Sequence, residues 1–163
     1  MEEKQKTNAF ENVKNQIGYC GIWCGSCVVG NGALRELTKR YKELINAYSL
    51  KDWAPKDFDF GEFYKGFESI QNMPLCPGCL KGGGRDNCEI RTCATEKGLQ
   101  DCTSCRQFGQ CNVELLEYMR SGARKAGLSV KNQDEDRRET VQKWMLELKA
   151  KWPCRILFMG DKP

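Results

Sequence analysis

The sequence contains no histidine among its 163 residues. This absence excludes zinc sites with mixed cysteine and histidine ligands. It also removes the usual general base at neutral pH, together with the Cys–His and Ser–His nucleophile pairs. Any metal ion that the chain binds must therefore be held by sulfur, with a carboxylate as the remaining candidate ligand.

Long apolar segments are also missing. No stretch reaches the roughly 18 consecutive apolar residues that span a membrane, and residues 1–16 are polar and mixed in charge, unlike a secretory signal. We therefore expect a cytoplasmic protein without a membrane partner. Disulfides seldom persist in a reducing compartment, and an odd number of cysteines, 11, fits complete pairing poorly, so a disulfide framework is disfavoured.

Charge of one sign is not abundant, because the formal net charge is only +4. The basic surplus lies late in the chain: residues 120–155 contain ten Lys or Arg and five Asp or Glu. We interpret these side chains as a solvated helix face, with a phosphate-binding patch for nucleic acid as the weaker alternative. An unidentified protein partner is the other candidate.

Apolar residues at helical spacing predict a small, mostly α protein with little strand and one irregular, metal-stapled, cysteine-rich segment. In chain order we expect a single domain (1–163) made of a flexible N-terminus (1–16), a first cysteine cluster (17–31), helices (32–73), a cysteine-rich metal-binding segment (76–111), C-terminal helices (112–152) and a tail (153–163).

Three apolar stripes at helical spacing are expected to face the core. The first is Leu34, Leu37, Tyr41, Leu44, Ile45 and Tyr48. The second is Phe60, Phe63, Phe67 and Ile70. The third, in the last helix, is Val141, Trp144, Met145, Leu148 and Trp152.

The cysteines follow a spacing that is typical of metal sites. Residues 18–27 read GYCGIWCGSC, with the spacing C-x3-C-x2-C, and the C-x2-C pair recurs twice within 76–111. Two intervening residues let both sulfurs of a tight turn face one ion while backbone N–H groups point at the sulfurs. Segment 76–111 has seven cysteines and few large apolar residues, so hydrophobic burial alone should not order it. The predicted metal ligands are Cys20, Cys24, Cys27, Cys76, Cys79, Cys88, Cys93, Cys102, Cys105 and Cys111.

Zinc held by four thiolates is the favoured cofactor, because it suits pairs of C-x2-C turns. Cys76 and Cys79 with Cys102 and Cys105 would form one such site. The alternative is a [4Fe–4S] cluster in an electron-transfer or redox protein, since all-cysteine ligation also suits iron–sulfur, although the ferredoxin run C-x2-C-x2-C-x3-C-P is absent. A redox-active dithiol ranks below both, because the sequence offers no βαβ context.

Two enzymatic interpretations are less favoured. Radical enzymes use the C-x3-C-x2-C spacing, but they build a large partial α/β barrel, whereas the pattern after Cys27 is helical. An open metal site with Glu89, Glu96 or Asp101 as acid or base is the other, although charged residues beside loop cysteines are usually solvated. We therefore expect a metal-binding interaction module rather than an enzyme.

The cysteine motifs together resemble the small cysteine-rich family catalogued as domain of unknown function 3795. The matching motifs are Y-C-G-x-x-C-x-x-C (19–27), C-x-G-C (76–79), C-x-I-R-x-C-A (88–94) and C-x-x-C with a later cysteine (102–111). The resemblance covers roughly residues 19–115 and implies metal binding, usually taken to be zinc, in a family without an assigned activity. Gln110 replaces a proline that is frequent there, and Cys154 lies outside the pattern. Arg91, inside the third motif, would bind a carbonyl, a thiolate or an anion.

Overall fold

The computed structural model describes residues 9–151, and over this range the fold is mostly helical, as predicted. The α-helices are α1 (Ala9–Val13), α2 (Ala33–Ala47), α3 (Leu50–Trp53), α4 (Phe60–Asn72), α5 (Glu89–Glu96), α6 (Glu114–Lys125) and α7 (Arg137–Lys151). The 3₁₀ helices are η1 (Cys24–Ser26), η2 (Cys79–Lys81), η3 (Cys102–Ser104) and η4 (Phe108–Gln110). The β pairing within these residues is limited to isolated bridges that join Ile17 to Trp23 and Ile22 to Val130. None of the helices described has the length and apolar content that crossing a bilayer requires.

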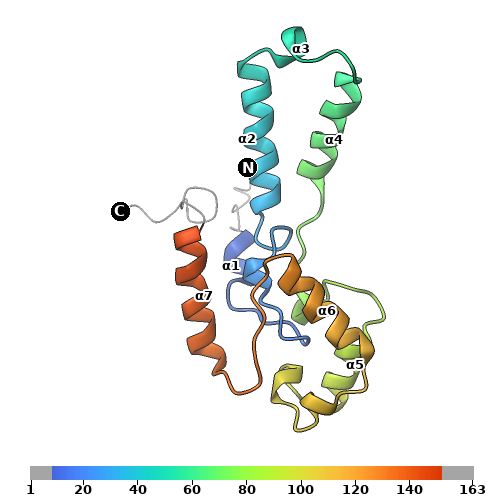
Figure 1. Ribbon diagram of the computed structural model, residues 1–163, viewed down its shortest axis with the longest axis vertical. Helices are drawn as coiled ribbons and strands as arrows, with labels where there is room; N and C mark the ends of the chain where they lie inside the picture. Colours follow the sequence, from blue (N-terminus) through green and yellow to red (C-terminus); the bar gives the residue numbers. More distant parts are fainter. Residues whose placement is uncertain (1–8, 152–163) are drawn as a thin grey trace, which may run out of the picture.

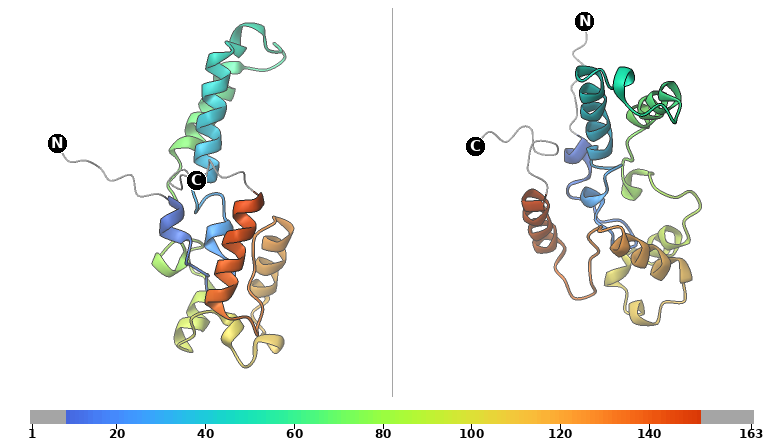
Figure 2. Two further views of the ribbon diagram at one scale, coloured as in Figure 1. Left: turned by 90° about the vertical axis from the view of Figure 1, so that its left-hand side faces the viewer. Right: turned by 45° about the horizontal axis from the view of Figure 1, so that its top comes forward.

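The molecule has two parts, a body and a projecting helical hairpin (Figure 1). Helices α2 and α4 lie side by side and antiparallel, with α3 at their turn, while α1, α5, α6 and α7 belong to the body (Figures 1 and 2). Asn31 accepts a hydrogen bond from the Ala33 N–H at 2.9 Å, and Asp59 accepts one from the Glu62 N–H at 2.9 Å. These side chains satisfy backbone donors in the first turn and so help to set where α2 and α4 begin.

One core of the body surrounds Trp23, which is fully buried. The Phe10 ring packs edge-on against it, with 6.4 Å between ring centroids, and the Trp144 ring of α7 stacks on it at 5.7 Å. The other residues of this core are Ile17, Ala33, Val141 and Leu148. The buried stripe predicted for the last helix is thereby confirmed for its described residues, whereas Trp152 and the tail lie outside the described range.

The flexible N-terminus expected over 1–16 is wrong for residues 9–16. Residues 9–13 form α1, and the side chains of Phe10, Val13 and Gln16 are buried. Phe10 orders this segment because it fills the space beside Trp23. Residues 1–8 lie outside the described range.

A second, smaller core lies between the cysteine-rich segment and α6. It consists of the buried residues Ile90, Ala94, Cys102 and Leu116, at the contact between α5 and α6. Tyr19, Cys20 and Phe108 pack against its edge. The segment therefore buries some apolar surface of its own, which the sequence alone did not lead us to expect, although this cluster is small.

The helical hairpin departs most from expectation. Tyr41, Leu44 and Tyr48 were predicted to lie in the core, yet 47%, 53% and 65% of their surfaces are exposed. Phe63 of α4 is also exposed, at 37%. The reason is geometric: α2 and α4 pack only as a pair, so one side of each apolar stripe has no third element over it among the described residues.

Candidate metal centre

The first cysteine loop is held by backbone hydrogen bonds rather than by a regular element. The Gly18 N–H donates to the Ile22 carbonyl at 2.8 Å, and the Cys24 N–H donates to the Gln16 carbonyl at 2.9 Å. The indole of Trp23 donates to the Lys14 carbonyl at 2.7 Å. Because Trp23 is anchored in the core, the adjacent turn η1 carries Cys24 to a fixed place at the edge of the body.

Five sulfurs lie in one neighbourhood, which we name the first thiol group. Its members are Cys20, Cys24, Cys76, Cys79 and Cys88. The Tyr19 N–H donates to the Cys79 sulfur at 3.4 Å, across 60 residues of sequence. A Cβ atom built on Gly18 would stand 2.8 Å from the Cys79 sulfur and 3.8 Å from the Cys20 sulfur. Both sulfurs thus flank the same glycine, which leaves them the room that a side chain would fill.

The members of the first thiol group influence one another's ionisation. Burial, as the largest cause, and the nearby Cys79, Cys20 and Cys76 side chains together raise the pKa of Cys24 to about 12. Burial also raises the pKa of Cys20 and of Cys79, and Cys88 adds to both shifts. Repulsion between thiolates is stronger in a poorly solvated site than in water, so each thiol there makes it harder for the others to ionise.

A second thiol group contains Cys93, Cys102, Cys105 and Cys111. Burial raises the pKa of Cys102 to about 12, with Cys111 and Cys93 as the next causes. Cys102 is buried, whereas Cys111 is exposed. Cys20 also raises the pKa of Cys102, so it lies between the two groups.

The described sulfurs gather without forming a closed coordination shell. Within residues 9–151, no three cysteine or carboxylate side chains stand close enough together to hold an ion as they are placed. All ten described cysteines are free thiols. The donor set nevertheless suits a thiophilic metal, because buried thiols in each group retain protons that a metal ion would displace, and backbone N–H groups such as that of Tyr19 already point at sulfur.

The grouping differs from the pairing that spacing suggested. Cys76 and Cys79 lie with Cys20 and Cys24 rather than with the Cys102 pair. The hairpin causes this, since it returns the chain to its starting point: a Cβ atom on Gly30 would stand 3.7 Å from the Cys76 carbonyl oxygen. Cys27 is not among the main neighbours that shift the pKa values of Cys20, Cys24, Cys79 and Cys102, and its backbone N–H closes the η1 turn by donating to the Cys24 carbonyl at 3.1 Å. Cys154 lies outside the described residues.

Arg120 of α6 is a buried link between the cysteine loops that sequence reasoning missed. Its guanidinium donates to the Cys20 carbonyl at 2.9 Å and to the Lys131 carbonyl at 2.8 Å, and it lies 4.9 Å from the centroid of the Phe108 ring. Burial lowers the pKa of Arg120. We expected this residue on a solvated face, and that interpretation is wrong because only 3% of its surface is exposed.

Asp101 has a structural environment rather than that of an open acid or base. Its carboxylate accepts hydrogen bonds from the Thr103 N–H at 3.0 Å and from the Thr103 hydroxyl, and it pairs with Arg137 of α7 at 3.0 Å. The Lys131 ammonium, also buried, lies 3.9 Å away and donates to the Thr103 hydroxyl. Glu89 and Glu96, the other candidate carboxylates, are exposed on α5. Of the three, only Asp101 is held in a buried network of hydrogen bonds and ion pairs.

Arg91 helps to order the loop that carries Cys79. Its guanidinium donates to the Gly83 carbonyl at 2.5 Å and to the Arg85 carbonyl at 3.4 Å. Its positive charge also lowers the pKa of Cys79, against the larger upward effect of burial. Of the roles expected for this residue, carbonyl binding is the one observed.

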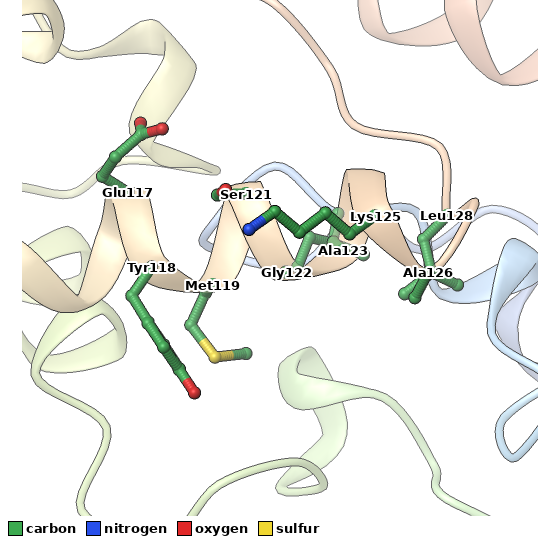
Figure 3. Close-up of a pocket in the computed structure, with 10 residues that line it drawn as sticks. Glu117, Tyr118, Met119, Ser121, Gly122, Ala123, Lys125, Ala126 and Leu128 are labelled. Atoms are coloured by element: carbon green, nitrogen blue, oxygen red, sulfur yellow. The ribbon is translucent and has the colours of Figure 1, made fainter.

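A pocket of about 610 Å³ lies along α6, and Figure 3 shows Tyr118 and Met119 pointing from the same side of that helix. Its other lining residues are Ile22, Glu117, Ser121, Gly122, Ala123, Lys125, Ala126 and Leu128. Since none of them is a cysteine, this pocket is separate from both thiol groups. A smaller pocket of about 420 Å³ does include Cys111, beside Phe108 and Arg124.

Comparison with known proteins gives one match. Searches of curated proteins and of solved structures return no match. A family model described as "Protein of unknown function (DUF3795)" matches residues 16–114, a range that contains every cysteine of both thiol groups but neither α1 nor α7. The chain therefore belongs to this family of unknown function, as its cysteine motifs had indicated.

Proposed function

We propose that this protein is a cytoplasmic, all-cysteine metal-binding protein in which structural zinc ions order an interaction module. The observation that carries the proposal is the first thiol group. Cys20 and Cys24 lie in the same neighbourhood as Cys76, Cys79 and Cys88 although the whole hairpin separates them in sequence. Four thiolates are the ligand set that structural zinc prefers.

The second thiol group supports a second ion. Cys93, Cys102, Cys105 and Cys111 supply four sulfurs from η3, the end of η4 and α5. The first group has one sulfur more than a zinc ion requires, so one of its members is a spare or bridging thiol. Buried, free thiols and a fold without paired cysteines among residues 9–151 suit a reducing compartment.

Elemental analysis of protein purified without air tests the proposal. We expect about two zinc ions per chain and no absorption band above ~350 nm. The variants Cys79→Ser and Cys105→Ser should each lose about one ion, because each removes a ligand from a different group. Cys154→Ser is the matched control and should keep both ions, since it lies outside the family motifs.

Three results contradict this proposal. Protein without bound metal argues against any metal function. A brown protein with broad absorbance near ~400 nm that bleaches on reduction carries an iron–sulfur cluster instead of zinc. Loss of both ions in either single variant would show that the two groups form one shared site.

A further inference from the structure

Gln16 contacts both cysteine loops of the first thiol group. Its backbone carbonyl accepts a hydrogen bond from the Cys24 N–H at 2.9 Å. Its side-chain amide donates to the Pro77 carbonyl at 3.0 Å, across 61 residues of sequence, and to the Asn12 carbonyl of α1 at 2.6 Å. Only 7% of Gln16 is exposed. One buried residue therefore links the loop of Cys24 to the turn that contains Pro77.

The place of Pro77 in the sequence connects this hydrogen bond to sulfur. Pro77 lies between Cys76 and Cys79, so its carbonyl belongs to the backbone turn of a C-x2-C pair. Because only two residues separate the cysteines, a hydrogen bond to the peptide between them limits the movement of both sulfurs. Lys81, which ends η2, donates to the Asn12 side chain at 2.5 Å, so α1 supports the same turn from a second point.

Hydrogen bonds to sulfur join the loop and the turn in both directions. The Tyr19 N–H donates to the Cys79 sulfur at 3.4 Å, and the Cys79 backbone forms a hydrogen bond to the Cys24 side chain in return. These contacts require the loop and the turn to keep one register. Gln16 sets that register, because its backbone binds the loop and its side chain binds the turn.

The oxygen of the Gln16 side chain indicates why this position holds an amide. Oε1 is buried and accepts no hydrogen bond from the part of the chain that the structure describes. It faces Gly78, where φ is +87° and where a Cβ atom would stand 2.2 Å from the oxygen. A buried polar atom without a partner lowers stability, and an apolar side chain of the same length would avoid this loss. Stability alone therefore does not account for the amide, whereas its hydrogen bond to the turn does.

We propose that Gln16 is a positioning residue of the first thiol group, which holds the turn at 76–79 beside Cys24 so that the sulfurs are gathered for zinc. This inference rests on the proposed zinc function. A ligand set that is already ordered binds its ion more tightly, because less conformational freedom is lost on binding. Residues that orient metal ligands typically contribute about ten- to a hundredfold in metal affinity. Gln16 has this role toward the first ion and not toward the second.

Zinc affinity measured in two backgrounds, each of which keeps one ion, tests this role. Cys105→Ser removes a ligand of the second thiol group and leaves the first ion, whereas Cys79→Ser leaves the second ion. In the Cys105→Ser background we expect Gln16→Met to weaken zinc binding by about ten- to a hundredfold, because methionine has a similar length but no donor. In the Cys79→Ser background Gln16→Met should leave zinc affinity unchanged. Competition with a chelator measures both affinities.

Cobalt(II) in place of zinc gives a second readout in the Cys105→Ser background. Its visible absorption bands depend on the geometry of the surrounding thiolates, so Gln16→Met should change them. Gln142→Met is the matched control, because it makes the same change at an exposed position of α7, a helix without cysteine. It should alter neither the zinc affinity nor the cobalt bands.

The outcomes separate this inference from the proposed function. Unchanged zinc affinity and cobalt bands in Gln16→Met overturn the positioning role, while the zinc site itself stands. An equal loss of affinity in both backgrounds also overturns it, since Gln16 would then support the fold as a whole. If the unchanged chain or the Cys105→Ser background binds no zinc, the proposed function fails and the positioning role fails with it.

Discussion

Asp101 and Arg137 form an ion pair with 3.0 Å between Oδ2 and Nη1, and this pair joins the second thiol group to α7. Asp101 directly precedes Cys102, and Arg137 begins the helix that stacks Trp144 on Trp23. Arg137 also donates to the Ile17 carbonyl at 3.1 Å in the first cysteine loop. One guanidinium therefore connects both cysteine loops with the aromatic core.

The Asp101 carboxylate should contribute more to stability than its arginine partner. Its side chain is 2% exposed, and its removal leaves the 5% exposed Lys131 side chain without a counter-charge. We expect Asp101→Ala to lower the free energy of unfolding by about 3–5 kcal/mol, as when one partner of a buried pair is removed. Arg137 is 28% exposed, so Arg137→Ala should cost only about 1 kcal/mol. Urea denaturation measures the free energy of unfolding of both variants. A larger decrease in Arg137→Ala than in Asp101→Ala would contradict this prediction.

Gly18 should be required for the first ion. In Gly18→Ala the new Cβ would stand 2.8 Å from the Cys79 sulfur and push it away from Cys20. We expect the variant to bind about one zinc ion fewer than the unchanged chain. Gly122→Ala is the control: a Cβ there meets open space on α6, so metal content should not change and stability should rise by about 0.5–1 kcal/mol. If Gly18→Ala binds as much zinc as the unchanged chain, Gly18 is not required for the first ion.

The affinity for zinc should rise with pH. Because burial raises the pKa of Cys24 and Cys102 to about 12, both are protonated thiols at neutral pH when no metal is bound. Zinc binds the thiolate, so a lower pH favours the protonated, metal-free form, and a higher pH favours the metal-bound form. We expect about a tenfold gain in affinity per pH unit for each thiol that ionises on binding. Competition with a coloured chelator between about pH 6.5 and 8.5 measures the slope. A flat profile would show that these thiols are not ligands.

Removal of metal should unfold the cysteine-rich segment while the rest of the fold stays intact. Its own core is small, consisting of Ile90, Ala94 and Cys102 with Leu116 of α6. Strong chelation should therefore expose amides in residues 76–111 to hydrogen exchange, while the core around Trp23 keeps its protection. Mass spectrometry of the chelated and untreated protein resolves the two regions. Equal protection in both samples would show that metal has no part in folding.

Several features were readable from the sequence because they depend on local patterns. Helical periodicity predicted the fold class and the stripe of Val141, Trp144 and Leu148 on α7. The start of α7 is local as well, because Asp136 accepts hydrogen bonds from the Arg138 and Glu139 N–H groups at 2.9 Å. Local spacing also identified the cysteines that the structure gathers.

Features that depend on distant contacts were not readable. The spacing of Cys76 and Cys79 does not reveal that the hairpin carries them back to Cys20, and one sequence does not show which stripe of α2 is covered. Arg120 was missed because a buried arginine has the same sequence signature as an exposed one. Its partners are backbone carbonyls such as that of Cys20, and every residue type has a carbonyl, so the sequence does not indicate which ones Arg120 binds.

The two ends of the hairpin lie next to each other, so the hairpin is a modular insertion in the body. The chain leaves the body at Gly30 and re-enters at Cys76, where the two backbones nearly touch. Shortening, lengthening or exchanging the helices between these points would leave the ends in register, and the entropy of closing such an excursion changes slowly with its length. Evolution or a protein engineer is thus free to vary the hairpin, and whatever it recognises, without rebuilding the sulfur-bearing body beneath it.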